Sequence, residues 1–127
     1  MMSLHSLSRR IYYRLSPRGR LLLRRIYYLP ADLFRRRDAM IPPRGMIFVG
    51  SGDFVHQGLQ QRDTIIRCTD LKPDATMLDV GSGIGRLAVA MTGYLTAEGR
   101  FEGFDVVKKG VDWCQKHITR RYPNFVN

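Results

Sequence analysis

The chain has 127 residues, a length that fits one domain of ordinary size. Its 21 lysines and arginines against 11 acidic residues give a net charge of +10, but a hydrophobic content of 44% is normal for a chain that builds a core, which excludes a disordered polycation. The apolar runs are far shorter than the roughly 20 residues that a membrane-spanning helix needs. We therefore expect a cytoplasmic protein, with peripheral attachment at a membrane surface left open.

The two cysteines, Cys68 and Cys114, lie 46 positions apart and match neither a C-x-x-C motif nor a zinc-ligand spacing. We expect both to be reduced, buried thiols, and we expect no structural metal.

The positive charge is concentrated at the N-terminal end. Residues 1–44 hold eleven arginines and two aspartates, a net charge of +9, whereas residues 45–127 hold ten basic and nine acidic residues. The sequence thus predicts a basic arm over residues 1–44, followed by the domain itself over residues 45–127.

Apolar residues in the arm recur at the spacing of a helix face, which predicts one helix over residues 4–15 and another that begins at Pro17 after a capping Ser16. Pro30 is expected to end the second helix, and a short helical turn over residues 31–37 follows. The segment 41–45, which contains two prolines and a glycine, breaks regular structure and marks the boundary of the arm.

Three interpretations of the arm stay open. Its arginines can form a solvated face on helices that pack their leucines against the following domain. They can instead attach the protein to an anionic membrane surface or another polyanion, or they can bind nucleic acid, although no recognisable nucleic-acid module accompanies them. A targeting peptide is a further alternative, without a recognisable cleavage signal.

A brief apolar run over residues 46–49 and a glycine-rich turn over residues 50–52 precede a predicted helix over residues 54–69. The turn lacks the lysine and hydroxyl residue of a phosphate-binding loop, so we interpret it as a plain turn. Asp53 and His56 are candidate catalytic residues, because they lie in the segment just before the elements of the predicted domain. Such a role predicts that their removal lowers turnover and leaves cofactor binding intact.

The most informative segment starts at residue 76. Residues 76–80 read as a short buried strand, residues 81–85 as a turn with three glycines, and residues 86–95 as a helix. This arrangement is half of a βαβ unit, in which glycines let bare backbone approach a ligand and the helix N-terminus offers unpaired N–H groups.

A second predicted strand over residues 100–105 ends in Asp105, twenty positions after Gly85, where a carboxylate can accept hydrogen bonds from ribose hydroxyls. A helix over residues 108–121 follows, with Trp113 and Cys114 expected in the core, and residues 124–127 could open a third strand. The predicted fold class is α/β: a partial Rossmann-like parallel sheet of two to three strands with flanking helices, after a basic helical arm.

The glycine turn reads Asp79-Val80-Gly81-Ser82-Gly83-Ile84-Gly85, whereas a dinucleotide fingerprint would need its third glycine at position 86, which is arginine. In this form the turn resembles motif I of the class I S-adenosylmethionine-dependent methyltransferases, and Asp105 matches that family's acidic residue after the second strand. The resemblance covers residues 71–127. It implies that the turn lies under the methionine part of S-adenosylmethionine, with Asp79 near the amino group, Asp105 on the ribose and Val106 beside the adenine.

The cofactor-binding residues that this resemblance implies are Asp79, Gly81, Ser82, Gly83, Gly85, Asp105 and Val106. The predicted function is a methyltransferase, or a truncated fragment of one, whose acceptor is unidentified and whose catalytic residues are unknown. A small-molecule acceptor is one candidate. The alternatives are an NAD-binding Rossmann protein and a non-enzymatic basic adaptor for an anionic membrane or nucleic acid.

A full domain of this family has seven strands, so the chain corresponds to its front half. In such folds a further strand covers the outer edge of the strand at residues 76–80. Without it an apolar edge would face solvent, and we expect the isolated chain to be prone to aggregation.

Overall fold

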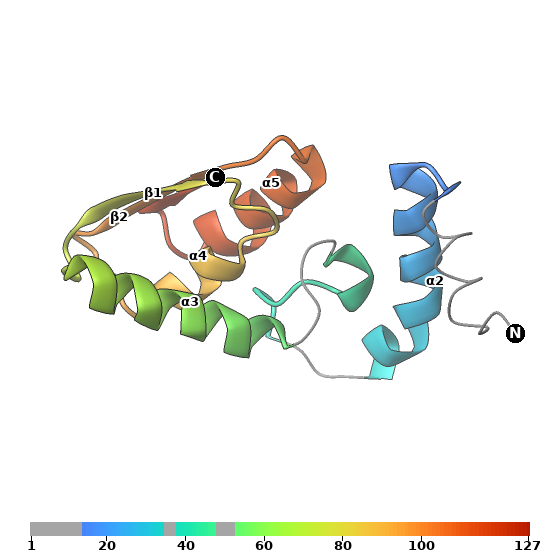
Figure 1. Cartoon of the computed structure of the whole chain (residues 1–127), viewed down its shortest axis with the longest axis horizontal. Helices are drawn as coiled ribbons and strands as arrows, with labels where there is room; N and C mark the ends of the chain where they lie inside the picture. Colours follow the sequence, from blue (N-terminus) through green and yellow to red (C-terminus); the bar gives the residue numbers. More distant parts are fainter. Residues whose placement is uncertain (1–13, 35–37, 48–52) are drawn as a thin grey trace, which may run out of the picture. The chain divides into compact units, whose positions relative to one another are not determined.

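A computed structural model describes residues 14–34, 38–47 and 53–127, which form parts of two compact units (Figure 1). One unit is drawn from residues 1–36 and 43–48, and the other from residues 37–42 and 49–127. Among the described residues, no helix is long and apolar enough to cross a membrane.

The first unit consists of helix α2 (Pro17–Phe34) and the 3₁₀ turn η1 (Arg44–Met46). Ser16 caps α2 as predicted, because its Oγ accepts a hydrogen bond from the Gly19 N–H at 3.2 Å. The η1 turn packs closely on α2: a Cβ on Gly45 would lie 2.8 Å from the Cα of Arg25. The helix predicted over residues 4–15 falls almost entirely outside the described residues.

The prediction that Pro30 ends the helix is wrong. Helix α2 continues through Pro30 to Phe34, so residues 31–34 of the expected short helical turn belong to α2, and residues 35–37 lie outside the described residues. A proline removes one hydrogen bond and crowds the preceding turn, but here only one turn of helix follows it. That turn is held from outside the helix, since the Arg44 N–H donates to the Asp32 carboxylate at 3.1 Å.

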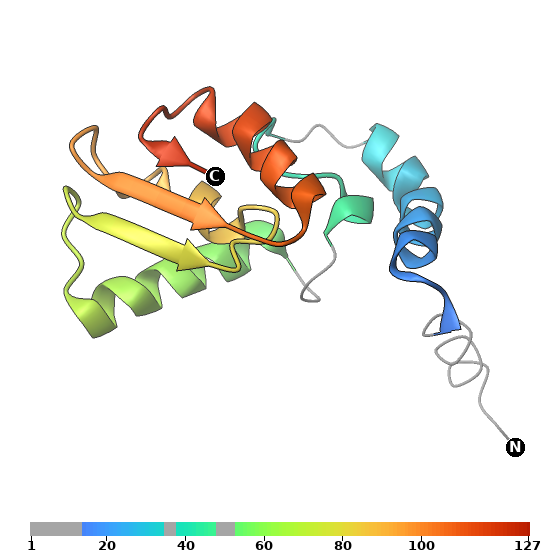
Figure 2. The same cartoon turned by 90° about the horizontal axis from the view of Figure 1, so that it is seen from above.

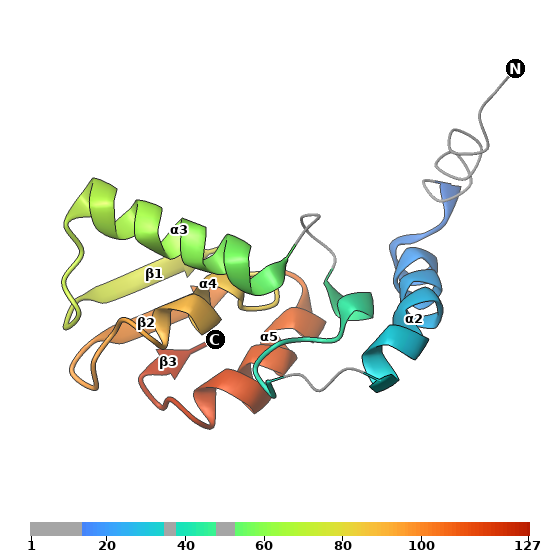
Figure 3. The same ribbon diagram turned by 90° about the horizontal axis from the view of Figure 1, so that it is seen from below.

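The second unit is built on a three-stranded parallel sheet in the order β1-β2-β3, with β1 (Thr76–Val80), β2 (Arg100–Phe104) and β3 (Phe125–Val126). Helices α3 (Phe54–Thr69), α4 (Arg86–Met91) and α5 (Lys108–Cys114) all lie on one face of this sheet (Figure 3). The predicted α/β fold, a partial Rossmann-like sheet with flanking helices, is therefore confirmed, including its third strand.

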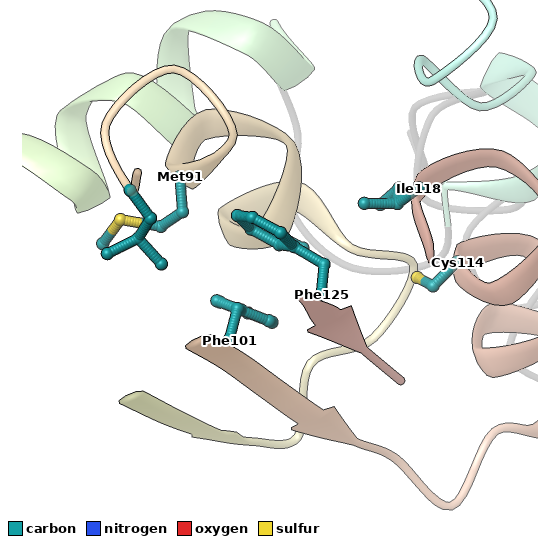
Figure 4. Close-up of a cluster of buried hydrophobic side chains, with 7 residues drawn as sticks. Met91, Phe101, Cys114, Ile118 and Phe125 are labelled. Carbon is teal, nitrogen blue, oxygen red and sulfur yellow. The ribbon is translucent and has the colours of Figure 1, made fainter. Parts of the chain in front are cut away.

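The core lies between the sheet and these helices. Phe101 of β2 and Phe125 of β3 are fully buried and stack with their ring centroids 5.3 Å apart. The same buried cluster contains Met91 of α4, Cys114 of α5 and Ile118, which follows α5 (Figure 4). Burial of this kind contributes about 1.5–3 kcal/mol for each large side chain, so the cluster holds both helices on the sheet.

Several predicted bounds and burials need correction. The helix predicted over residues 86–95 ends at Met91 and continues as turns, and the one predicted over residues 108–121 consists of α5 followed by the π-type segment η2 (Gln115–Thr119). Cys114 is buried as expected, but Cys68, in the last turn of α3, is exposed. Helix α3 itself has the predicted bounds.

None of the described helices of the second unit lies on the opposite face of the sheet (Figure 2). Side chains alternate along the strands, so the residues of β1 and β2 that do not enter the core point to this face. It exposes four large apolar side chains to between 41% and 69% of their full area, namely Leu78, Val80, Phe104 and Val126. Strand β1 is also an edge, as expected, since it pairs with β2 alone among the described strands.

We expect the open sheet face to drive self-association of the isolated chain. Replacing Leu78 with threonine should reduce aggregation and change the free energy of unfolding by less than about 0.5 kcal/mol, because the side chain is exposed. Light scattering during size-exclusion chromatography and chemical unfolding measure the two effects.

Met77→Thr is the matched control, because Met77 is the neighbouring residue on the core side of β1. It should destabilise the fold by about 2 kcal/mol or more. Equal destabilisation by the two substitutions would contradict the assignment of the open face.

Candidate functional site

The predicted glycine turn joins β1 to α4 and depends on its glycines. Gly81, Gly83 and Gly85 have φ values of +82°, +61° and +79°, a region that costs other residues about 1–2 kcal/mol. The N–H groups of Gly81 and Ser82 both donate to the carbonyl oxygen of Phe104, at 2.9 and 3.1 Å. The first two residues of the turn are therefore hydrogen-bonded to the last residue of β2.

Asp105, the first residue after β2, fastens the turn a second time. One of its carboxylate oxygens accepts the Gly83 N–H at 2.8 Å, and the other accepts the Val107 N–H at 2.7 Å. Sequence reasoning assigned Asp105 to a ligand's ribose and missed this structural role. The two roles are compatible, because a carboxylate can accept about four hydrogen bonds and these use two.

Asp79 lies in β1, two residues before the turn, and is half-buried. Burial raises the pKa of its carboxyl group above the ordinary value, and the negative charge of Asp105 raises it further. Among the described residues no group donates a hydrogen bond to the Asp79 side chain. The site therefore brings the carboxylates of Asp79 and Asp105 close enough to interact electrostatically. The Asp79 carboxylate has no hydrogen-bond donor among the described residues.

The backbone of the turn is accessible at its first two glycines. A Cβ built on Gly81 would meet no atom within 4 Å, and one on Gly83 would meet only the Gly81 carbonyl oxygen, at 4.0 Å. At Gly85, by contrast, an added Cβ would lie 2.6 Å from the Sγ of Cys114. The first two glycines thus leave open space beside the main chain, whereas the third lets α5 and η2 pack closely.

Gly110 of α5 is a further residue on which the site depends, and sequence reasoning missed it. A Cβ there would lie 2.1 Å from the Gly83 carbonyl oxygen, so only glycine lets α5 approach the turn. The available signal was a glycine inside a predicted helix, which often marks close packing.

The remaining predicted residues have contrasting environments. Ser82 is only 7% exposed, and its Oγ is buried without a hydrogen-bond partner among the described residues. Val106, directly after Asp105, is 98% exposed. An apolar side chain so exposed contributes almost nothing to folding, so it is free to contact a ligand at this edge of the sheet.

Cys114, beneath the turn, has no accessible thiolate. Burial, together with the charges of Asp105 and Asp79, raises the pKa of its thiol to about 12. Trp113, also expected in the core, is half-buried and stacks on His117 with ring centroids 3.8 Å apart. Partial burial and the charge of Lys116 lower the pKa of His117.

Asp53 and His56 lie at the start of α3. Asp53 is the N-cap, since its carboxylate accepts the His56 N–H at 2.8 Å, and the His56 side chain is exposed. The cap gives Asp53 a structural role, and a catalytic role for either residue stays a prediction. The glycine-rich turn at residues 50–52 lies outside the described residues.

Within residues 14–34, 38–47 and 53–127, no cluster of three or more histidine, cysteine, aspartate or glutamate side chains is placed to hold a metal ion.

The described part of the second unit has a partial Rossmann-like α/β fold, with a three-stranded parallel sheet and flanking helices. No known protein-family profile matches the chain. Among solved structures, coclaurine N-methyltransferase bound to N-methylheliamine and SAH matches with a TM-score of 0.49 and 16% sequence identity. The match covers 96% of the present chain but only 40% of the methyltransferase chain, so the protein described here spans less than half of the other's length.

We expect the first and third glycines to differ in their tolerance of alanine. Gly81→Ala should cost about 1–2 kcal/mol of stability, from the positive φ alone. Gly85→Ala should cost about 3 kcal/mol or more, because the new Cβ also overlaps the Cys114 sulfur. Chemical denaturation of the two variants measures the difference, and equal costs would contradict the packing described around Gly85.

We also expect Asp79→Asn to stabilise the fold at neutral pH. The raised pKa means that the charged carboxylate is less favourable in the folded than in the unfolded chain, and asparagine removes that charge. The gain should disappear as the pH falls through the raised pKa towards 3.8, because the wild-type side chain then becomes neutral as well. Thermal unfolding at pH 7 and pH 4 tests this. A variant that is less stable than the wild type at pH 7 would contradict it.

Proposed function

We propose that this chain carries the S-adenosylmethionine-binding half of a methyltransferase. The observation that carries the proposal is the pairing of an open glycine turn with two carboxylates at the same edge of the sheet. The register aligns Val80 with Phe104, so the residues that follow, Gly81 and Asp105, lie side by side. In open α/β sheets the carboxyl ends of the strands are where ligands bind.

The charge of the site favours a cationic ligand. Asp79 has its pKa raised by burial and by Asp105, and no described group donates a hydrogen bond to it. A bound ammonium group would relieve both effects, because a nearby positive charge favours the ionised carboxylate. S-adenosylmethionine carries an ammonium and a sulfonium group, whereas the pyrophosphate of a dinucleotide would add negative charge beside two carboxylates.

The position of Arg86 also argues against a dinucleotide. It begins α4 at the place of the third fingerprint glycine, and its guanidinium lies 5.6 Å from the centre of the Phe54 ring. The third glycine of a dinucleotide site serves close packing of helix and strand. Here the third glycine of the turn is Gly85, one position earlier, and it lets α5 and η2 approach the turn closely.

Each part of the cofactor has a matching group in this chain. The Gly81–Gly83 backbone would lie against the methionine part, with Asp79 accepting from its ammonium group. Asp105 would accept from the ribose hydroxyls with the lone pairs that the turn leaves unused, and Val106 would pack against the adenine. When bound, S-adenosylmethionine supplies an electrophilic methyl group on its sulfonium sulfur.

The contribution of this chain to catalysis would be positional, because its residues fix the nucleoside and the amino-acid part of the donor. The methyl acceptor is proposed to bind outside the described residues.

Binding of S-adenosylhomocysteine, the product form of the cofactor, is the direct test. At a concentration of about 100 times Kd it should stabilise the folded chain by about 2.7 kcal/mol, which raises Tm by several degrees, while NAD should produce no shift. A shift with NAD alone would favour the dinucleotide alternative, and no shift with either ligand in a folded sample would contradict the proposal.

The exposed Val106 provides a test that does not depend on folding. Val106→Ser should leave Tm unchanged without ligand and weaken S-adenosylhomocysteine binding by about fivefold to tenfold, because it removes an apolar contact with the adenine. Val55→Ser is the matched control, an exposed valine on α3. Isothermal titration measures both, and equal affinities for the two variants would remove Val106 from the site.

A further inference from the structure

Helix α2 exposes a continuous apolar stripe. Leu22, Ile26, Leu29 and Leu33 recur at steps of four, three and four residues, which places them within about 60° of one another around the helix axis. All four side chains are exposed, to between 54% and 72% of their full area. A row of exposed large apolar side chains over about three turns of one helix is a marker of an interaction surface.

Among the described residues of its own unit, the contacts on α2 lie on a different side of the helix. The η1 turn packs against the backbone of Arg25, and the half-buried residues of α2 include Arg24, Tyr28 and Asp32. These positions lie roughly a third of a turn around the axis from the stripe. The turn therefore braces one side of the helix and leaves the stripe uncovered.

The charge of the sequence that contains α2 indicates the kind of partner. The first acidic residue of the chain is Asp32, and eleven arginines lie within residues 1–44. The Asp32 carboxylate accepts the Arg44 N–H, so it already has a partner. The segment therefore combines an apolar stripe with an excess of arginine. An anionic lipid bilayer is complementary to both features, because its interior is apolar and its headgroups are negatively charged.

Nucleic acid fits these observations less well. Its phosphates would pair with the arginines but would leave the four apolar side chains in water. A bilayer accommodates both, because the apolar side chains leave water for the acyl region while the arginines approach anionic headgroups.

We propose that α2 lies in the plane of an anionic membrane, with Leu22, Ile26, Leu29 and Leu33 inserted at the boundary between headgroups and acyl chains. The helix is about 27 Å long and does not qualify as a spanning segment, so it attaches the protein at the surface. This attachment is independent of the proposed cofactor site.

Sedimentation of the whole chain with vesicles tests the proposal. The chain should bind vesicles of equal parts phosphatidylglycerol and phosphatidylcholine at least about tenfold more tightly than vesicles of phosphatidylcholine alone, and added salt should weaken the binding. The double variant Leu22→Gln and Ile26→Gln should bind the anionic vesicles at least about tenfold more weakly than the wild type does, because glutamine keeps the helix but removes the inserted apolar surface.

Tyr27→Gln is the matched control, because Tyr27 is more exposed to solvent than Leu22 or Ile26 but lies on another side of α2. It should bind anionic vesicles within about twofold of the wild type. The emission of Trp113, which lies in the second unit, reports whether that unit remains folded in every variant.

A second measurement does not depend on loss of binding. Tryptophan placed at position 29 should be quenched by lipids brominated on their acyl chains, and tryptophan at position 27 should be quenched less. Equal quenching at both positions would overturn the proposal, and so would vesicle binding unchanged by the double variant. Tighter binding to polyuridylic acid than to anionic vesicles, or a change of oligomeric state in the double variant without loss of vesicle binding, would also overturn it.

Discussion

The hydrogen bonds from the backbone N–H groups of Gly83 and Val107 to the Asp105 carboxylate hold the candidate site together. They tie the glycine turn after β1 to the segment after β2, and the Phe104 carbonyl accepts two more N–H groups from the same turn. Charge-assisted hydrogen bonds are stronger than neutral ones, so one carboxylate fixes the shape of the turn without any help from a ligand. The main chain at Gly81 and Gly83 is thereby positioned before anything binds.

This arrangement has an electrostatic consequence. The carboxylate that organises the turn also opposes ionisation of Asp79, which is already half-buried. Repulsion between these two negative groups destabilises the folded chain at neutral pH. A bound cationic ligand would be attracted by the same two charges, and this attraction would favour binding. Local destabilisation that only a ligand relieves is typical of functional sites.

The sequence predicted the sheet and its order of elements because short apolar strands, a glycine turn and acids at the strand tips are all local signals. It failed at Pro30, where the Arg44 N–H supports the end of α2 from a distance of twelve residues. It also failed at Cys68, because an exposed thiol at the end of an amphipathic helix has the same local sequence context as a buried one. The structural role of Asp105 and the close approach at Gly110 arise from contacts between separate elements, which local patterns do not contain.

The central claim is that the two carboxylates divide the ligand between them, with Asp79 on the amino-acid part and Asp105 on the nucleoside. Isothermal titration of the wild type and Asp79→Asn with S-adenosylhomocysteine and with adenosine tests this division directly. The account predicts that the substitution weakens S-adenosylhomocysteine at least about tenfold and leaves adenosine affinity unchanged, since adenosine has no ammonium group. Equal loss for both ligands, or loss for neither, would contradict it.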